Sequence, residues 1–266
     1  MSILITGSGG IVGRHIVEKL RLLFEKSDII LFEGDLVDIS QTQSLIKKAG
    51  SIKSVIHLAA MVSVDAVKAD PARAYSINVG GTVNLLGALA QSCQTPHVFH
   101  CSSAHVYEPK SNAISEEAET TPLSLYGRSK LLAEIAAKDI CASHGMPLCI
   151  GRVFSIHDPC QKGPYLRPSV MKRLSQENLN IPFELPGADS IRDFLTAQEA
   201  AQLIVSLTVA KYCGIINIGS GKPTPIRDFV QGFTTKKLDI RHTGKKNCLL
   251  ADTTKLNTFL EKKNVS

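Results

Sequence analysis

The sequence predicts an α/β protein with a doubly wound parallel sheet. Short β-type runs alternate with stretches of helical character through the first half of the 266-residue chain. Such alternation makes the strands parallel and places helices on both faces of the sheet. A hydrophobic content of 44% and a charged content of 20% are typical of a folded globular protein. The expected strands are Ile3–Thr6, Ile29–Phe32, Val55–Leu58, Val98–His100 and Leu148–Ile150.

A glycine-rich loop, Thr6-Gly-Ser-Gly-Gly-Ile-Val-Gly13, joins the first strand to a helix that begins near Ile11. Gly7 permits a tight turn, Gly10 lets the backbone approach a pyrophosphate, and Gly13 lets the helix pack closely on the strand. The start of the helix offers free N–H groups to the anion. The loop alone could be an ordinary turn, and its spacing differs from the Gly-x-Gly-x-x-Gly of many dehydrogenases. Its position between a strand and a helix predicts a dinucleotide-binding (Rossmann) sheet.

Glu33 ends the second strand, twenty residues after Gly13. A carboxylate there can accept hydrogen bonds from both adenosine ribose hydroxyls and would repel a 2′-phosphate, which favours NAD over NADP. The alternative is an ordinary surface glutamate. The run Glu33-Gly-Asp-Leu36 leaves no room for the usual helix after this strand, so Asp35 is a candidate for contact with the adenine.

Three helix ends carry recognisable signals. Asp70 before Pro71 is an N-cap followed by proline at the first helical position, and Gly145 follows a helix that runs up to His144. The segment Thr196-Ala-Gln-Glu199 is a capping box.

The second half of the chain is less regular. Five prolines between residues 158 and 187 favour a looped, smaller substrate-binding lobe rather than more sheet. We therefore expect a dinucleotide-binding domain over residues 1–158 and a C-terminal lobe over residues 159–266, part of which returns to the Rossmann sheet.

Tyr126 and Lys130 stand four residues apart near the start of a predicted helix, so their side chains share one face. Lowering the pKa of a tyrosine by about 3 units, for use near pH 7, requires roughly 4 kcal/mol of phenolate stabilisation. Lys130 and a nicotinamide ring are the expected sources, and the ammonium can also hold the nicotinamide ribose. Ser103, after the strand that ends at Cys101, is the candidate hydroxyl for the substrate oxygen. Alone, the Tyr-Lys pair would more often be a surface pair.

Eight segments, in this order, resemble the extended short-chain dehydrogenase/reductases, specifically the NAD-dependent epimerase/dehydratase family that works on nucleotide sugars. They are Thr6–Gly13, Gly34–Asp38, Val55–Ala60, Asn78–Thr82, Ser102–Tyr107, Tyr126–Lys130, Arg192–Leu195 and Ile216–Gly221. The resemblance covers most of the chain and implies that Ser103, Tyr126 and Lys130 form a catalytic triad. It implies an enzyme that reduces a keto sugar nucleotide, or epimerises one through a transient keto sugar, with NAD as cofactor and no metal.

The resemblance also implies which residues contact the cofactor and the substrate. Ala59 and Ala60 would line the cofactor, and Asn78 would lie behind the active site. The expected cofactor contacts are Gly7, Gly10, Ile11, Val12, Gly13, Glu33, Asp35, Leu36, Leu58, Ala59, Ala60, Asn78, Tyr126 and Lys130. The expected substrate contacts are Ser103, His105, Ser155 and Arg192.

Arg192 matches the family arginine that grips the substrate diphosphate, a role that suits a planar guanidinium. The alternative is a surface ion pair with Asp193 or Asp189. Ser155 stands where the family usually has asparagine, and His157-Asp-Pro159 replaces the common Tyr-Gly-Pro. These departures leave the identity of the sugar open.

Members that eliminate water resemble one another in carrying an Asp-Glu pair just after the catalytic hydroxyl residue. Ala104 and His105 occupy those positions here, and the glutamate that decarboxylating members carry at the second is also absent. Alanine cannot transfer protons, so we expect reduction or epimerisation rather than 4,6-dehydration. His105 could still donate a proton to the sugar, or simply pack beside Tyr107.

The cysteines, the net charge and the apolar runs exclude several other classes of protein. Seven scattered cysteines, never in a Cys-x-x-Cys pair, argue against a disulfide framework or zinc knuckle. The net charge of +6 comes with no aromatic residues among the C-terminal lysines, so a solvated basic face is expected rather than nucleic-acid binding. No run reaches the roughly 18 apolar residues of a membrane span, and the N-terminus does not resemble a signal peptide. We therefore expect a cytoplasmic protein without membrane contact.

Two further expectations concern assembly and alternatives. Relatives commonly dimerise through two helices, here 71–91 and 126–144, so the resemblance implies a homodimer. A different class of function is a catalytically silent NAD-binding regulatory subunit, which the intact triad argues against. A reductase of a non-sugar ketone is a third reading, which Arg192 disfavours because a guanidinium suits a diphosphate better than a hydrocarbon.

Overall fold

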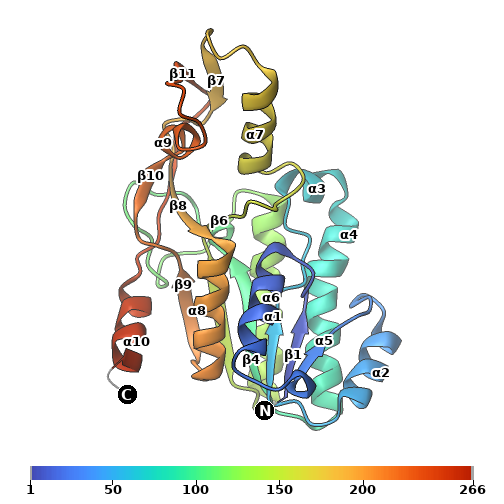
Figure 1. Ribbon diagram of the computed structural model, residues 1–266. Coiled ribbons are helices and arrows are strands. Elements are labelled where there is room, and N and C mark those ends of the chain that lie inside the picture. Colours follow the sequence, from blue (N-terminus) through green and yellow to red (C-terminus); the bar gives the residue numbers. More distant parts are fainter. Residues whose placement is uncertain (1, 265–266) are drawn as a thin grey trace.

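The computed structural model describes residues 2–264 and confirms the doubly wound parallel sheet (Figure 1). Six strands lie in the order β2-β1-β3-β4-β5-β9, and every neighbouring pair is parallel. Their bounds are β1 Ile3–Thr6, β2 Ile29–Leu31, β3 Ser54–His57, β4 His97–Ser103, β5 Leu148–Val153 and β9 Gly214–Ile218. All five predicted strands are present. β4 and β5 extend further than predicted, and β4 ends at Ser103.

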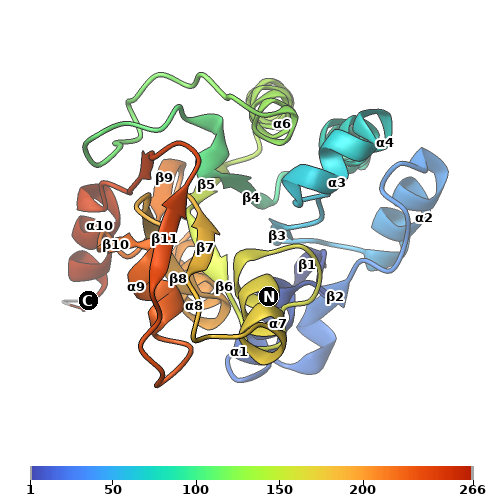
Figure 2. The ribbon, with the colours of Figure 1, turned by 90° about the horizontal axis from the view of Figure 1, so that it is seen from above.

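Helices cover both faces of this sheet (Figure 2). On one face, α1 (Ile11–Arg21) packs against α8 (Ala197–Val209) over the side chain of Phe99. On the other, α5 (Gly81–Gln91) lies between α2 (Ile39–Ala49) and α6 (Leu125–Ser143), over Val98. Phe99 and Val98 are consecutive and fully buried, because side chains alternate between the faces of a strand.

One sequence expectation about this sheet is wrong, because a helix does follow the second strand. After β2, residues 32–38 form a loop in which Asp35 Oδ1 accepts a hydrogen bond from the amide of Val37 at 2.9 Å. Asp38 then caps α2 by accepting from the amides of Ser40 and Gln41. The cap, rather than the end of the strand, sets where the helix begins. Only one strand lies beyond β1, whereas the usual order of this fold has two.

The segment predicted as one helix over 71–91 has three parts. The first part is α4 (Pro71–Tyr75), which Asp70 caps with proline at the first position, as predicted. A separate short helix, α3 (Val64–Ala69), ends just before this cap. A π-helical turn, η2 (Ser76–Gly80), then joins α4 to α5. Turns of this kind contain one residue more than an α-helical turn and are frequent at functional sites.

The other two predicted helix ends are confirmed. Thr196 and Glu199 form the reciprocal capping box at the start of α8. Gly145 follows the C-cap of α6 with φ +65°, a conformation that favours glycine.

The C-terminal lobe stands above the carboxyl ends of the central strands (Figure 1). The hydrophobic core of the lobe contains Val170, Phe183, Leu185 and Val230. The proline-rich stretch, expected to be looped, contains a regular helix, because Pro168 lies in the first turn, where an N–H is not needed. The elements here are β6 Ser155–His157, α7 Leu166–Gln176, β7 Phe183–Pro186, β8 Ile191–Thr196, β10 Pro223–Pro225, α9 Ile226–Gln231, β11 Ile240–Thr243 and β12 Cys248–Leu249. The last helix, α10 (Thr254–Asn264), instead packs beside β9 of the central sheet.

Short 3-10 turns complete the chain, η1 at Lys26–Asp28 and η3 at Ala104–Val106. The seven cysteines carry free thiols. Between residues 2 and 264, no helix combines the length and the apolar composition that crossing a bilayer requires.

Candidate active site

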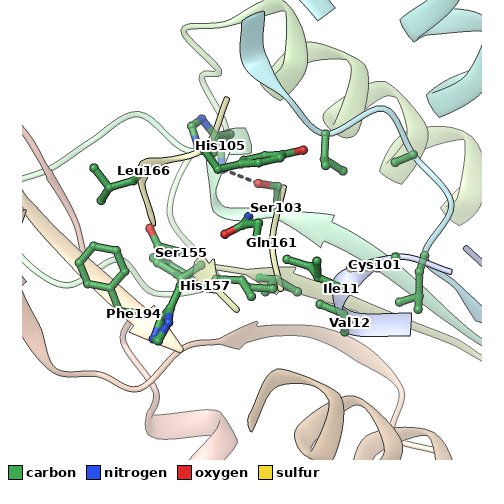
Figure 3. Close-up of a pocket in the computed structure, with 18 of the residues that line it drawn as sticks. Ile11, Val12, Cys101, Ser103, His105, Ser155, His157, Gln161, Leu166 and Phe194 are labelled. Carbon is green, nitrogen blue, oxygen red and sulfur yellow. Dashed lines mark hydrogen bonds between the residues drawn. The ribbon is translucent and has the colours of Figure 1, made fainter. Parts of the chain in front are cut away.

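A cavity of about 730 Å³ lies between the carboxyl ends of the central strands and the lobe (Figure 3). It brings together the glycine-rich loop, the end of β4, the start of α6 and strand β8. The predicted residues that line it are Gly7, Gly10, Ile11, Val12, Gly13, Leu58, Ala59, Ala60, Ser103, His105, Tyr126, Ser155 and Arg192. The predicted residues outside its lining are Glu33, Asp35, Leu36, Asn78 and Lys130.

The glycine-rich loop leaves bare backbone at one end of the cavity. Gly7 has φ +71°, and a Cβ there would lie 2.7 Å from the amide nitrogen of Ala59. A Cβ on Gly13 would collide with the carbonyl of Gly7. Gly10 is the N-cap of α1 and supplies no side-chain acceptor, so the helix's first N–H groups remain available to an anion. This arrangement fits a dinucleotide pyrophosphate.

A buried histidine ties this loop to the strand beside it. The Thr82 hydroxyl donates to the carbonyl of Asn78 at 2.7 Å, so it accepts from His57 Nε2 at 3.0 Å. His57 Nδ1 is then the bare acceptor for the Thr6 hydroxyl at 2.7 Å. Burial and the charge of Lys130 lower the pKa of His57 to about 3, which keeps this neutral tautomer. Thr6 in turn accepts from the amide of Ala59 at 3.2 Å, which fixes the cofactor-facing segment.

The catalytic candidates meet where η3 packs on the first turn of α6. Ser124 caps α6 by accepting from the amide of Gly127, and a Cβ on Gly127 would collide with the carbonyl of His105. The Ser103 hydroxyl accepts from the amide of His105 at 3.2 Å. Burial raises the pKa of Tyr126 well above its ordinary value, and the side-chain hydrogen bond with Ser103 offsets part of that rise. The phenol is therefore protonated at neutral pH in the protein alone.

The sequence offers packing beside Tyr107 as one alternative for His105, but the structure places His105 against Tyr126 instead. Its ring stands edge-on to the ring of Tyr126, with centroids 5.5 Å apart. Burial and the charge of Arg192 lower its pKa, so the imidazole is neutral at pH 7. It lies between the triad and the arginine of the lobe.

Lys130 lies one turn after Tyr126 and is 4% exposed. Burial lowers its pKa, and interactions with Cys101 and Glu134 raise it in part. In this arrangement its charge acts on Cys101, His57 and His100 rather than on Tyr126. From the sequence we expect Lys130 to help lower the pKa of Tyr126, and in the protein alone this effect is not seen.

Asn78 lies in the π-helical turn and is 1% exposed. Its Oδ1 accepts from the amide of Met61 at 2.7 Å, and its Nδ2 donates to the Ser129 hydroxyl at 2.9 Å. The side chain thus joins the segment after β3 to α6, behind the cavity.

A buried ion pair holds α6 against the sheet. Arg152 on β5 donates from Nη2 and Nε to the two carboxylate oxygens of Glu134, at 2.7 and 3.0 Å. The Ser102 hydroxyl donates to the same carboxylate, and Arg152 Nη1 donates to the hydroxyl of Tyr107. Both charged side chains are at most 3% exposed. The helix that carries Tyr126 is therefore fixed next to the strand that carries Ser103.

Arg192 faces the cavity from β8. The alternative ion pairs are absent among the described residues, because Asp193 accepts from Ser220 and Gly221 and Asp189 pairs with Arg227. Arg192 donates from Nη1 to the carbonyl of Ile191, and burial lowers its pKa. Its remaining donors are available to an anion in the cavity.

Glu33 and Asp35 lie exposed in the loop after β2. The Asp35 carboxylate is engaged by the amide of Val37, and Leu36 is buried against Gly81. The structure therefore does not bring these three into the cavity with the other cofactor candidates.

Sequence reasoning missed the outer wall of the cavity. Phe194 and Phe229 stack with centroids 3.8 Å apart and an angle of 8°, and His157 stands edge-on to Phe229. Gln161 and Tyr165 line the same cavity from an irregular loop. Phe194 lies within the segment Arg192–Leu195, and His157 begins the run His157-Asp-Pro159, but neither pattern indicated a place in the cavity. Phe229, Gln161 and Tyr165 belong to no motif and come together only through the fold.

A family model described as GDP-mannose 4,6 dehydratase matches residues 17–263. The chain belongs to this family. It is therefore an extended short-chain dehydrogenase/reductase of the epimerase/dehydratase type. A GDP-6-deoxy-D-mannose reductase of Pseudomonas aeruginosa is 28% identical over 236 residues, which cover 85% of this chain and 77% of the relative.

Solved structures of the epimerase/dehydratase type share the fold. A UDP-glucose 4-epimerase of Thermus thermophilus in complex with NAD has a TM-score of 0.82 at 21% identity, covering 97% of this chain and 92% of that one. RMD from Pseudomonas aeruginosa, complexed with NADPH, has a TM-score of 0.82 at 24% identity, with the same coverage.

Proposed function

We propose that this chain is a nicotinamide-dependent enzyme that reduces a keto nucleotide sugar, or epimerises a nucleotide sugar through a keto intermediate. One observation carries the proposal. A single cavity joins a bare glycine loop, the Ser103–Tyr126 pair and the guanidinium of Arg192. These are the three parts that a dinucleotide, a sugar hydroxyl and a diphosphate would need. The reductase and epimerase relatives support this reading.

The residues take the following roles in the proposal. The amides at the start of α1 bind the cofactor pyrophosphate, and Ala59 lies along the cofactor. The nicotinamide, when bound, accepts or returns the hydride. Tyr126 moves the proton at the sugar oxygen, Ser103 hydrogen-bonds that oxygen, and Arg192 binds the diphosphate.

The first test follows both the cofactor and the product. Purified protein with NAD or NADH, incubated with UDP- and GDP-sugars and their 4-keto forms, is expected to reduce or epimerise at least one of them. Nicotinamide absorbance reports reduction, and NMR of the product reports epimerisation. Bound NAD without turnover of any nucleotide sugar would instead favour the silent regulatory subunit, and turnover of apolar ketones alone would favour a non-sugar reductase.

The same experiment tests the position after Ser103. Ala104 is 1% exposed and its methyl group cannot transfer a proton, so the acid–base pair for elimination is incomplete there, although His105 lies edge-on to Tyr126. We expect no 4-keto-6-deoxy product from any nucleoside-diphosphate hexose, although the matching family model carries the name of a dehydratase. That product at turnover-level yield would contradict the argument.

We propose NAD as the physiological cofactor, with Glu33 on the adenosine ribose. Glu33 is exposed in the loop after β2, where it would meet a cofactor that extends past the glycine loop. Glu33→Ala removes a charge that repels a 2′-phosphate, so affinity for NADP should rise relative to NAD. Calorimetric dissociation constants for both dinucleotides measure the ratio. An unchanged ratio would assign the discrimination to another residue.

We further propose that the enzyme is a cytoplasmic homodimer, with α5 and α6 as its interface. Val83 on α5 and Leu132 and Ile135 on α6 are 39%, 44% and 45% exposed, so two helices that pack against each other both present large apolar side chains to the solvent. The other small or apolar candidates on α6 are Leu131, Ala136 and Ile140. Light scattering at micromolar concentration should give twice the 28.7 kDa chain mass, and Ile135→Glu should give the monomer. A wild-type monomer would contradict the proposal.

A further inference from the structure

The loop after β6, residues 158–165, forms part of the wall of the cavity. Gln161 and Tyr165 line the cavity from this loop, and Leu166 and Arg167 continue the wall at the start of α7. Tyr165 is near enough to Tyr126 to influence its ionisation. The position of this loop therefore decides which groups face the catalytic tyrosine from the substrate side.

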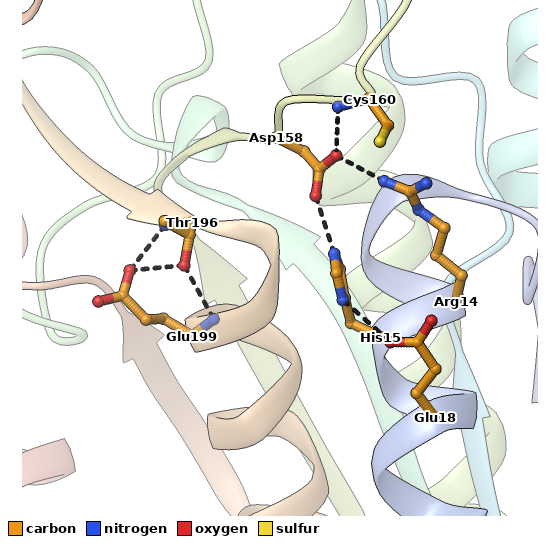
Figure 4. Close-up of polar contacts among 7 residues, drawn as sticks. All are labelled: Arg14, His15, Glu18, Asp158, Cys160, Thr196 and Glu199. Carbon is orange, nitrogen blue, oxygen red and sulfur yellow. Dashed lines mark hydrogen bonds and ion pairs between the residues drawn. The ribbon is translucent and has the colours of Figure 1, made fainter.

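The loop begins at a buried carboxylate, Asp158, which is 4% exposed (Figure 4). Its Oδ1 accepts from Arg14 Nη2 at 2.5 Å and from the amide of Cys160 at 2.7 Å, and its Oδ2 contacts His15 Nε2 at 2.8 Å. Burial raises the pKa of Asp158, but the hydrogen bonds from His15, Cys160 and Arg14 lower it further than burial raises it. The carboxylate is therefore ionised at neutral pH.

These contacts join two parts of the chain that are far apart in sequence. The contact with Cys160 lies within the loop, whereas Arg14 and His15 belong to the first turns of α1. Arg14 directly follows Gly13, the last glycine of the phosphate loop. His15 is also held by Glu18 on the same helix, with Nδ1 3.4 Å from the carboxylate. One aspartate thus connects the helix that would receive the pyrophosphate to the loop that faces the substrate.

We propose that Asp158 is a positioning residue that fixes the 158–165 loop to the phosphate-loop helix, so that a dinucleotide bound at α1 orders Gln161 and Tyr165 for the nucleotide sugar. For the identity of the two ligands the inference rests on the proposed function. Asp158 does not face the cavity and acts only through the loop. The consequence is binding synergy, in which the cofactor raises the affinity for the sugar nucleotide.

Hydrogen exchange without any ligand tests the connection itself. In Asp158→Asn, which keeps the size of the side chain and removes its charge, amides of residues 160–163 should exchange about tenfold faster than in wild type. His15→Gln should act in the same direction from the helix side. Glu199→Gln is the matched control, because the Glu199 carboxylate also accepts a backbone N–H, but among the described residues its hydrogen bonds go to Thr196, within its own capping box (Figure 4). Wild-type exchange in Asp158→Asn, or equal acceleration in Glu199→Gln, would overturn the proposal.

Calorimetry with NAD, UDP and GDP tests the synergy. In wild type, NAD should lower the dissociation constant of the preferred nucleoside diphosphate about tenfold, a typical coupling. In Asp158→Asn, NAD should still bind, but the dissociation constant of the nucleoside diphosphate should be nearly the same with and without NAD. Glu199→Gln should retain the tenfold difference. Retained coupling in Asp158→Asn would overturn the positioning role. Failure of wild type to bind NAD would refute the proposed function instead, while the ligand-free exchange experiment would still decide whether Asp158 holds the loop.

Discussion

Tyr126→Phe is expected to lower turnover by about 10²- to 10⁴-fold, the usual contribution of a positioned acid–base group. The substitution removes the hydroxyl that moves the proton and leaves the ring on which His105 packs. Affinity for NAD should remain nearly unchanged, because the pyrophosphate would bind at the glycine loop. Lys130→Ala should differ by also weakening NAD, since it removes the ammonium that we expect, from the sequence, to hold the nicotinamide ribose. Retention of most of the turnover in Tyr126→Phe would refute the assignment.

The raised pKa of Tyr126 makes the two directions of the reaction respond differently to pH. Reduction uses the protonated phenol as a donor, which is the form that burial favours at neutral pH. Oxidation needs the phenolate, so its rate should rise with pH until the phenol is ionised, while the rate of reduction should fall over the same range. Tyr212→Phe, at a tyrosine outside the cavity that packs on Phe259, is the control and should leave both profiles unchanged.

Arg152→Met is expected to reduce the free energy of unfolding by about 3–5 kcal/mol, because it leaves the buried carboxylate of Glu134 without its partner. Burial lowers the pKa of Arg152, but the hydrogen bonds and charge of Glu134 raise it further, so Arg152 is charged in the folded protein. Urea unfolding at pH 7 measures the loss. A loss below about 1 kcal/mol would show that the pair does not stabilise α6.

The double variant Arg152→Met, Glu134→Leu removes both charges. It therefore separates the loss of the ion pair from the cost of leaving one buried charge unpaired. It should be less destabilised than Arg152→Met alone, because neither charge remains in the interior. Arg241→Met, at an exposed pair with Asp239, is the matched control and should change the unfolding free energy by at most about 1 kcal/mol.

The sequence predicted the site best where local chemistry decides the structure. The glycine loop, the cap at Asp70 and the spacing of Tyr126 and Lys130 depend on neighbouring residues, and each lies on the predicted element. The start of α2 was missed, because the run Glu33–Leu36 leaves no room for a helix directly after the strand, whereas the helix begins later, at the cap that Asp38 forms. Gln161, Tyr165 and Phe229 enter the cavity through the packing of the lobe on the sheet, which no local pattern encodes. The catalytic roles remain predictions.

The π-helical turn at Ser76–Gly80 is a point where the helix could lose one residue and remain helical. An α-helical turn advances by 3.6 residues, and the wider turn accommodates one more residue without changing the faces that α4 and α5 present. A variant lacking one residue between 76 and 80 could therefore close into continuous α-helix and keep both packed faces. It would lose the inward setting of Asn78 between Met61 and Ser129. Shortening the chain at this position would then keep the scaffold and remove the support behind the active site.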